Sequence, residues 1–211
     1  MKIKGFQPLT LSDYPSKVAA IVFTQGCNFR CPFCHNGDLL PLDCNPDDLF
    51  PEEDVLQKIA KRAKQLDALV ITGGEPTLQH DLVDFARKVK ALGLLVKLDS
   101  NGTNPKMLQQ LIDEKLVDYI AMDIKTSLEK YHLISGVRTP LDKILKSIYI
   151  ISSSGIDHQF RTTFVPALMD EKDLEEIRKI VPKNSLYIVQ KFNPENALDE
   201  SLREDLEKVK V

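Results

Sequence analysis

The chain has 211 residues, of which 43% are hydrophobic and 28% are charged, and its formal net charge at pH 7 is -3. This length suits one domain with a sizeable core, so we expect residues 1–211 to form a single domain. The slightly acidic balance gives no support for nucleic-acid binding, and no apolar run is long enough to span a membrane. Residues 1–5 lack the apolar core of a secretion signal, so we expect a cytoplasmic protein with reduced thiols.

Regular elements are expected along most of the chain. Residues 2–17 are predicted to form an N-terminal hairpin or cap, and residues 36–51, rich in Pro, Asp and Asn, a long surface loop. Apolar runs predict strands at residues 18–24, 68–72, 94–99, 118–125, 157–165 and 186–192. Apolar residues at helical spacing predict helices at residues 52–65, 81–92, 105–115, 142–153, 171–180 and 198–209.

Strands that alternate with helices form right-handed βαβ units around a parallel sheet, which makes this an α/β chain. About six units are present, fewer than the eight that close a (β/α)8 barrel. The pattern alone therefore leaves two architectures open, an open partial barrel and a doubly wound sheet.

Three cysteines, Cys27, Cys31 and Cys34, follow the first strand of this alternating series within one short loop. Thiolates grouped this closely can bind one soft metal centre, and iron–sulfur clusters are held mainly by cysteines. A closed cubane takes four protein ligands and this loop offers three. We therefore predict a [4Fe–4S] cluster with one iron open to a further ligand. Cys44 lies in the 36–51 loop and is expected not to be a ligand.

Two other interpretations of the cysteine loop remain open. His35 could complete a structural Cys3His zinc site, although its position next to Cys34 is awkward for closing one tetrahedron. A disulfide is the second alternative, but the chain lacks the secreted character that favours one.

Other unusual residues also follow predicted strands, in three segments: Gly73-Gly74-Glu75-Pro76, Asp99-Ser100-Asn101-Gly102 and Met122-Asp123-Ile124-Lys125. In parallel α/β folds, function lies at the carboxyl ends of the strands. Strand alternation also places charged residues on one sheet face, namely Lys97 with Asp99, Asp123 with Lys125, and Arg161 with Thr163. Because a mixed-charge face is costly to bury under helices, we expect it to line a polar cavity.

Structural interpretations of these segments stay open. The Gly-Gly-Glu-Pro and Asp-Ser-Asn-Gly segments are also ordinary turn sequences, and Lys125 could be a solvated residue at a strand end. A carboxylate beside two glycines can instead receive an ammonium group. Four further residues have no assigned role: Tyr131, Gly136, Arg138 and Gln190.

The cysteine triplet with Phe33, followed by Gly73–Pro76 at the next strand end, resembles the radical S-adenosylmethionine superfamily. Within this superfamily, several short stretches of the sequence are similar to the activating proteins of anaerobic ribonucleoside-triphosphate reductase. The stretches concerned include Asp13-Tyr14-Pro15, Thr24-Gln25-Gly26-Cys27 and Cys34-His35-Asn36. The resemblance implies a partial (β/α)6 barrel with the cluster at the C-terminal ends of the strands.

The resemblance also implies roles for single residues. Cys27, Cys31 and Cys34 would hold three irons, and the fourth would chelate the amino and carboxylate groups of S-adenosylmethionine. The predicted cofactor-binding residues are Phe33, Gly73, Gly74, Glu75, Asp99, Ser100, Asp123, Lys125 and Arg161. Phe33 would lie near the adenine, and residues 73–75 would meet the methionine ammonium. The Asp99 region would surround the cofactor carboxylate, which in some related activases is joined by a monovalent cation, and Lys125 would contact cofactor or substrate.

The implied reaction is reductive cleavage of the cofactor to a 5′-deoxyadenosyl radical, which takes a hydrogen atom from a glycine of a partner enzyme. Electrons would come from an external flavodoxin or ferredoxin, because the 36–51 loop has no further Cys-x-x-Cys pair. Two alternatives remain: a small-molecule radical enzyme resembling 7-carboxy-7-deazaguanine synthase, and a zinc-binding or electron-transfer module.

Overall fold

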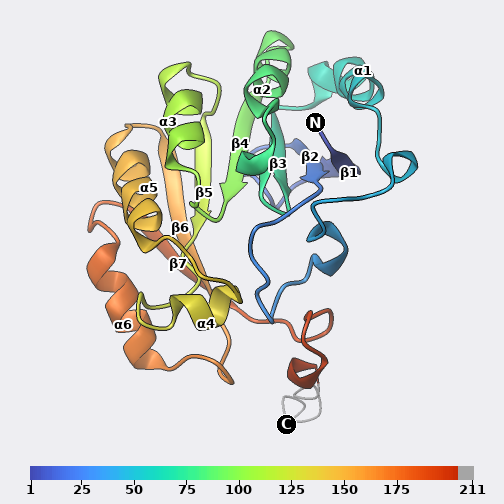
Figure 1. Cartoon of the computed structure of the whole chain (residues 1–211). Helices are drawn as coiled ribbons and strands as arrows, with labels where there is room; N and C mark the ends of the chain where they lie inside the picture. The colour runs from blue at the N-terminus through green and yellow to red at the C-terminus, as the bar shows by residue number, and fades with distance from the viewer. Residues whose placement is uncertain (204–211) are drawn as a thin grey trace.

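The computed structural model describes residues 1–203 and arranges them as a curved seven-stranded sheet with helices along one side (Figure 1). The strands lie side by side in chain order: β1(Ile3–Thr10), β2(Ala19–Thr24), β3(Ala68–Gly73), β4(Leu95–Ser100), β5(Tyr119–Asp123), β6(Asp157–Phe164) and β7(Leu186–Lys191). β1 pairs antiparallel with β2, and every later pair is parallel. The predicted α/β class is confirmed.

Helices provide the crossovers between the parallel strands. They are α1(Glu52–Arg62), α2(Leu82–Ala91), α3(Pro105–Asp113), α4(Tyr131–Ser135), α5(Leu141–Ser153) and α6(Glu171–Ile180). Sequence patterning missed α4, because five residues are too few for a helical period. The helix predicted at 198–209 is wrong at its start, where the described residues form a single 3-10 turn, Glu200–Leu202. The rest of that prediction, 204–211, lies outside the described residues.

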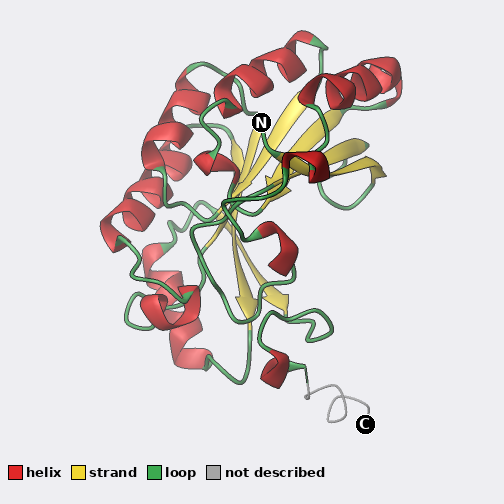
Figure 2. Ribbon diagram, turned by 45° about the vertical axis from the view of Figure 1, so that its right-hand side comes forward, coloured by secondary structure: helices red, strands yellow, loops and turns green. Residues whose placement is uncertain are grey.

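The sheet is an open partial barrel. A doubly wound sheet reverses its strand order at a switch point, whereas β2 to β7 run in one direction without reversal. Within residues 1–203, β7 pairs with β6 alone and does not meet β1. Figure 2 shows the helices along the outer side of the curved sheet. Side chains alternate between the two faces along each strand, so those that point away from the helices line the inner side of the sheet.

Two apolar clusters cover opposite faces of the sheet. The larger one lies between the sheet and the helices and includes Val96, Leu98 and Ile120. The smaller one fills the inner face near the amino ends of the strands, where the rings of Tyr14 and Tyr119 lie 5.5 Å apart. This inner cluster leaves the polar residues nearer the carboxyl ends. No helix in residues 1–203 is long and apolar enough to cross a bilayer.

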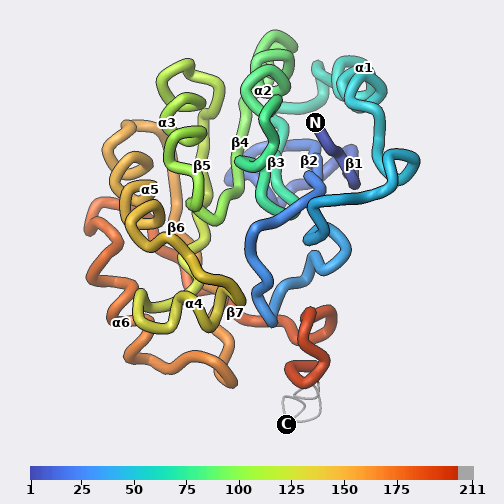
Figure 3. The backbone as a smooth tube through the Cα atoms, viewed as in Figure 1, coloured from blue at the N-terminus to red at the C-terminus, as the bar shows by residue number. Residues whose placement is uncertain are grey.

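The chain after β7 returns to the cysteine loop. The colours of Figure 3 show this segment passing beside the loop that follows β2. The Asp199 N–H donates to the Pro32 carbonyl over 2.8 Å, and Ala197 is fully buried. Residues 192–203 therefore cover part of the cysteine loop.

Candidate functional site

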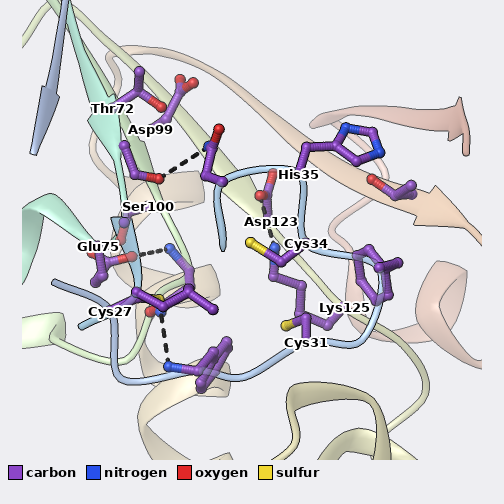
Figure 4. A pocket seen from close by; sticks show the side chains of 18 of the residues that line it. Cys27, Cys31, Cys34, His35, Thr72, Glu75, Asp99, Ser100, Asp123 and Lys125 are labelled. Atoms are coloured by element: carbon purple, nitrogen blue, oxygen red, sulfur yellow. Dashed lines mark hydrogen bonds and ion pairs between the residues drawn. The ribbon is translucent and has the colours of Figure 1, made fainter. Parts of the chain in front are cut away.

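A cavity opens at the carboxyl ends of the parallel strands, next to the cysteine loop. Figure 4 shows the three cysteines around it, with Glu75 and Ser100 on one side and Asp123 and Lys125 on the other. Every predicted site residue lines this cavity: Cys27, Cys31, Phe33, Cys34, Gly73, Gly74, Glu75, Asp99, Ser100, Asp123, Lys125 and Arg161. Carboxyl ends of parallel strands meet at one edge, which is why residues up to 134 positions apart in the chain come together.

The cysteine loop holds its three thiols free of disulfides. Cys27 and Cys31 are buried, and Cys34 is half-buried. The Phe29 N–H donates to the Cys27 sulfur over 3.4 Å, and the Cys34 N–H closes a turn on the Cys31 carbonyl over 3.0 Å. Hydrogen bonds to sulfur are one of the means by which a protein tunes an iron–sulfur centre.

Burial determines the protonation state of the free thiols. Burial raises the pKa of Cys27 to about 11 and that of Cys31 to about 12, so both are protonated at neutral pH when no metal is bound. A bound metal replaces such protons and keeps the sulfurs as thiolates. The donor set, three cysteines at the edge of one cavity, therefore fits the iron–sulfur cluster that was predicted.

The zinc alternative lacks its fourth ligand. The His35 ring contacts the Asn193 carbonyl at 2.5 Å and stacks on Phe192 with 6.0 Å between ring centroids. Figure 4 shows the ring turned away from the three sulfurs. Within residues 1–203, no three His, Cys, Asp or Glu side chains are close enough to hold one metal ion. A cubane differs because each thiolate binds its own iron, so the sulfurs stand further apart.

The Gly73–Pro76 segment supports the cysteine loop through its backbone. The Gly74 N–H donates to the Thr24 carbonyl over 2.9 Å, and the Glu75 N–H donates to the Gly26 carbonyl over 2.8 Å. A Cβ atom at Gly74 would lie 2.2 Å from the Gly26 carbonyl oxygen. Glycine is therefore required here by the close contact between β3 and the start of the cysteine loop.

The Glu75 carboxylate is 1% exposed and accepts four hydrogen bonds. Its Oε1 accepts from the Thr77 N–H, the Thr77 hydroxyl and the Ser100 hydroxyl, and its Oε2 accepts from the Asn101 N–H over 2.6 Å. Burial raises the pKa of Glu75, and these donors oppose part of the rise. Glu75 thus links the ends of β3 and β4, a structural role that sequence reasoning did not anticipate.

Charged residues of β4, β5 and β6, with Lys125 just beyond β5, form one connected wall of the cavity. Arg161 donates from Nε and NH2 to Asp123 Oδ1 over 2.8 Å, and its NH1 lies 3.5 Å from Asp99 Oδ2. Lys125 Nζ donates to Asp123 over 3.0 Å, and Lys97 Nζ donates to Asp99 from the layer below. Three cationic groups meet two carboxylates, so this wall carries an excess of one positive charge.

Mutual pairing fixes the charge states in the wall. Burial acts to raise the pKa of Asp123, but Arg161 and Lys125 outweigh it and lower that pKa below its ordinary value. Burial likewise acts against the Lys125 ammonium, and Asp123 outweighs it and raises the pKa of Lys125. The ammonium lies 5.9 Å from the centre of the Phe33 ring, in a cation–π geometry.

Two residues without an assigned role turn out to position the cysteine loop. A Cβ at Gly136 would lie 2.3 Å from the Arg30 carbonyl oxygen, and the Arg30 N–H donates to the Ser135 carbonyl over 2.8 Å. Tyr131 is fully buried and packs edge-on against Phe29 of the cysteine loop, with 6.4 Å between ring centroids, and its hydroxyl accepts from the Lys125 N–H over 3.3 Å. Of the other two, Arg138 lies in a separate surface depression and Gln190 is an exposed residue of β7.

The cavity lining also includes residues for which the sequence predicted no binding role: Phe29, Asn36, Leu40, Thr72 and Asn101. The Asn101 amide donates to Asn28 over 2.8 Å, and Asn28 donates to Thr103 over 2.9 Å. These bonds tie the cysteine loop to the turn after β4. Asparagine is common in turns, so no sequence signal separates this role from an ordinary turn.

Curated proteins of similar sequence match most of this chain. A candidate glycyl-radical enzyme activating enzyme of Methanocaldococcus jannaschii is 39% identical over 209 residues, which is 95% of this chain and 84% of that protein. The pyruvate formate-lyase-activating enzyme of Clostridium pasteurianum is 28% identical, covering 85% of this chain and 74% of that enzyme.

Solved structures share the fold at low sequence identity. Streptococcus suis SuiB bound to its precursor peptide SuiA matches with a TM-score of 0.67 and 17% identity, over 89% of this chain and 44% of SuiB. SuiB bound to S-adenosylmethionine matches with a TM-score of 0.64. This chain therefore spans less than half the length of SuiB.

The family model of the radical SAM superfamily matches residues 21–181, which include the whole cysteine loop and the strands β3 to β6 that form the cavity. This superfamily uses a [4Fe–4S] cluster with S-adenosylmethionine, in agreement with the thiols and the polar cavity described above. The chain belongs to the radical SAM superfamily.

Proposed function

We propose that this chain is a cytoplasmic activating enzyme that generates a glycyl radical on a partner protein, with anaerobic ribonucleoside-triphosphate reductase as the expected partner. The observation that carries the proposal is the 39% identity to a candidate glycyl-radical enzyme activating enzyme along 95% of this chain. A similarity of that extent reaches well beyond the cysteine loop.

The residues of the cavity would divide the work of binding. Cys27, Cys31 and Cys34 would hold the cluster, which, when bound, supplies the electron that cleaves S-adenosylmethionine to methionine and a 5′-deoxyadenosyl radical. Phe33 would lie beside the adenine. Glu75 Oε2 accepts one internal hydrogen bond, whereas Oε1 accepts three, so Oε2 has more capacity for the methionine ammonium.

The charged wall would orient the other end of the cofactor. Its excess positive charge suits a carboxylate, and the pairing of Arg161 with Asp123 and Asp99 holds the guanidinium in place. Lys125 lies between Asp123 and Phe33, where its ammonium would contact cofactor or substrate. Because these side chains are held by each other, they need little rearrangement when the cofactor binds.

The open edge of the sheet supports a protein substrate. In the described residues β7 has a neighbour on one side alone, and its Leu186 and Val189 are 55% and 40% exposed. A closed barrel admits ligands through one end, whereas an open edge also lets a loop of another protein reach the cavity from the side. Cys44 does not line the cavity, which supports one cluster and an external flavodoxin or ferredoxin as the electron donor.

Anaerobic reconstitution with iron and sulfide, followed by reduction in the presence of S-adenosylmethionine and a candidate reductase, tests the proposal. The expected result is methionine, 5′-deoxyadenosine and the doublet of a glycyl radical in the EPR spectrum of the partner. A reductase whose radical glycine is replaced by alanine is the matched control and should give no doublet. Cofactor cleavage without a doublet on any glycyl-radical protein of the same genome would contradict the activase and favour a small-molecule substrate.

A further inference from the structure

Lys97 is a buried ammonium beneath the charged wall. Its side chain is 3% exposed, and it does not line the cavity itself. Its register neighbours are Val70 on β3 and Tyr119 on β5, both members of the apolar inner cluster. From this apolar layer its Nζ reaches up to Asp99 Oδ1, its one hydrogen-bond partner within the described residues. A buried ammonium is costly unless it is paired, so the position calls for an explanation.

The explanation lies in the sign of the charge that faces the cavity. Without Lys97, Asp99 and Asp123 would be matched by Lys125 and Arg161, and the wall would be neutral. Arg161 makes short contacts with Asp123, whereas its distance to Asp99 is 3.5 Å, so Asp99 would be the less satisfied carboxylate. A carboxylate without a close cationic partner attracts a dissolved cation or repels a ligand carboxylate.

We propose that Lys97 is a positioning residue that serves as the built-in cation of Asp99, so that the wall binds the carboxylate of S-adenosylmethionine without a dissolved monovalent cation. This revises the monovalent cation that the family resemblance suggested for the Asp99 region. The ammonium is tethered and therefore always present, whereas a dissolved ion binds according to its concentration. The inference concerns cofactor binding alone, so it does not depend on which protein receives the radical.

Lys97→Met tests the proposal, because methionine keeps the volume and removes the charge. Affinity for S-adenosylmethionine is measured by anaerobic equilibrium dialysis of the reconstituted protein in sodium, potassium and choline chloride of equal ionic strength. Wild-type affinity is expected to be the same in all three salts. Lys97→Met is expected to bind about tenfold more weakly in choline, with sodium or potassium restoring most of the loss.

Metal-free protein gives an independent measurement. The melting temperature of Lys97→Met should be higher in sodium or potassium than in choline, because an ion then occupies the place beside Asp99. Lys97→Arg should behave like wild type in every salt. Lys179→Met, which removes an exposed lysine paired with Glu176, controls for the general loss of one positive charge.

Three results would overturn the assignment: a wild-type affinity that depends on sodium or potassium, a Lys97→Met affinity equal to wild type in choline, and a loss that is identical in the three salts. The last would mean that Lys97 merely stabilises the fold. If Lys97→Met does not fold, the wild-type and Lys97→Arg measurements still decide, since cation dependence in either contradicts a built-in cation. Failure to activate a glycyl-radical partner would leave all these measurements intact.

Discussion

The Glu75 N–H donates a hydrogen bond of 2.8 Å to the Gly26 carbonyl, one residue before the first cysteine of the loop. The same segment brings Gly74 so close to Gly26 that a side chain has no room. The end of β3 and the start of the cysteine loop are thus one packed unit. A motif that the sequence analysis associated with the cofactor thus also determines where the cysteines proposed as cluster ligands lie.

Gly74→Ala should displace the cysteine loop. Its methyl carbon would meet the Gly26 carbonyl oxygen at 2.2 Å, and relief of this clash should cost about 1–3 kcal/mol of stability. Because Cys27 follows Gly26, we expect most of the iron to be lost on anaerobic reconstitution, as measured by iron and sulfide analysis.

Gly93→Ala is the matched control for this change. Gly93 has a left-handed backbone with φ of +80°, and a Cβ there meets no atom within 4 Å. This variant should lose about 1–2 kcal/mol through backbone strain while keeping full iron content. Equal iron content in Gly74→Ala and Gly93→Ala would show that the contact with Gly26 does not position the cluster ligands.

Cys31→Ala should abolish cluster assembly, whereas Cys44→Ala should leave the iron content unchanged. Cys31 is a buried member of the cavity lining, while Cys44 lies in the loop between β2 and α1 away from it. Iron content and the visible charge-transfer absorption of the reconstituted variants provide the measurement. Loss of iron in Cys44→Ala would show that the ligand set is wrong.

Glu75→Gln should keep the cluster but weaken the binding of S-adenosylmethionine. The amide preserves the shape of the side chain but removes the charge that would attract the methionine ammonium, for an expected loss of about tenfold or more. The new N–H2 group also faces donors of Ser100, Thr77 or Asn101, so the melting temperature should fall as well.

Thr77→Val separates these two effects. It removes the hydroxyl that donates to Glu75 Oε1 and leaves the carboxylate charged. We expect a loss of about 1 kcal/mol of stability with little change in cofactor affinity. If both variants lose affinity to the same degree, Glu75 acts as a structural link between β3 and β4 and not as a ligand of the ammonium.

Asp173→Asn should destabilise the protein at neutral pH and have little effect in acid. Burial acts to raise the pKa of Asp173, but hydrogen bonds from Lys130 and Ser127 outweigh it and lower the pKa. A carboxyl with a lowered pKa contributes stability that is complete above its ordinary pKa and is lost as the pH falls through the folded value. Wild type and variant should differ by about 2 kcal/mol at pH 7, and the difference should begin to shrink near about pH 4 and disappear once the pH is below the lowered pKa of the folded state.

Chemical unfolding across this pH range is the measurement. Asp84→Asn, at a carboxylate whose side chain is 72% exposed, is the control and should show a small effect at every pH. A difference for Asp173→Asn that stays constant into acid would mean that packing, and not the charged hydrogen bonds, accounts for the loss. Asp173 anchors the segment before α4 through its hydrogen bonds with Ser127 and Lys130.

Local apolar patterns in the sequence predicted most of the helices and strands. Helix α6 coincides with its prediction, and β2 to β7 agree with theirs within about two residues, because each has a clear apolar period. The short helix α4 and the 3-10 turn Glu200–Leu202 lack such a period and depend on tertiary contacts. The contact of Gly136 with Arg30 joins segments more than 100 residues apart, and neither residue carries a signal that names its partner.

By itself, the sequence determined the chemistry available at the site: three thiols in one loop, glycines and a carboxylate after β3, and charges on alternating positions of β4 to β6. Parallel strands bring their carboxyl ends to one edge, so the meeting of these groups followed from their order in the chain. Tertiary structure alone decided how each charge is matched. Asp99 and Asp123 both follow an apolar residue in a strand, yet the buried Lys97 pairs with Asp99, whereas Arg161 and Lys125 at the cavity pair with Asp123. Burial and distance set the energy of a charge, and both are properties of the folded chain.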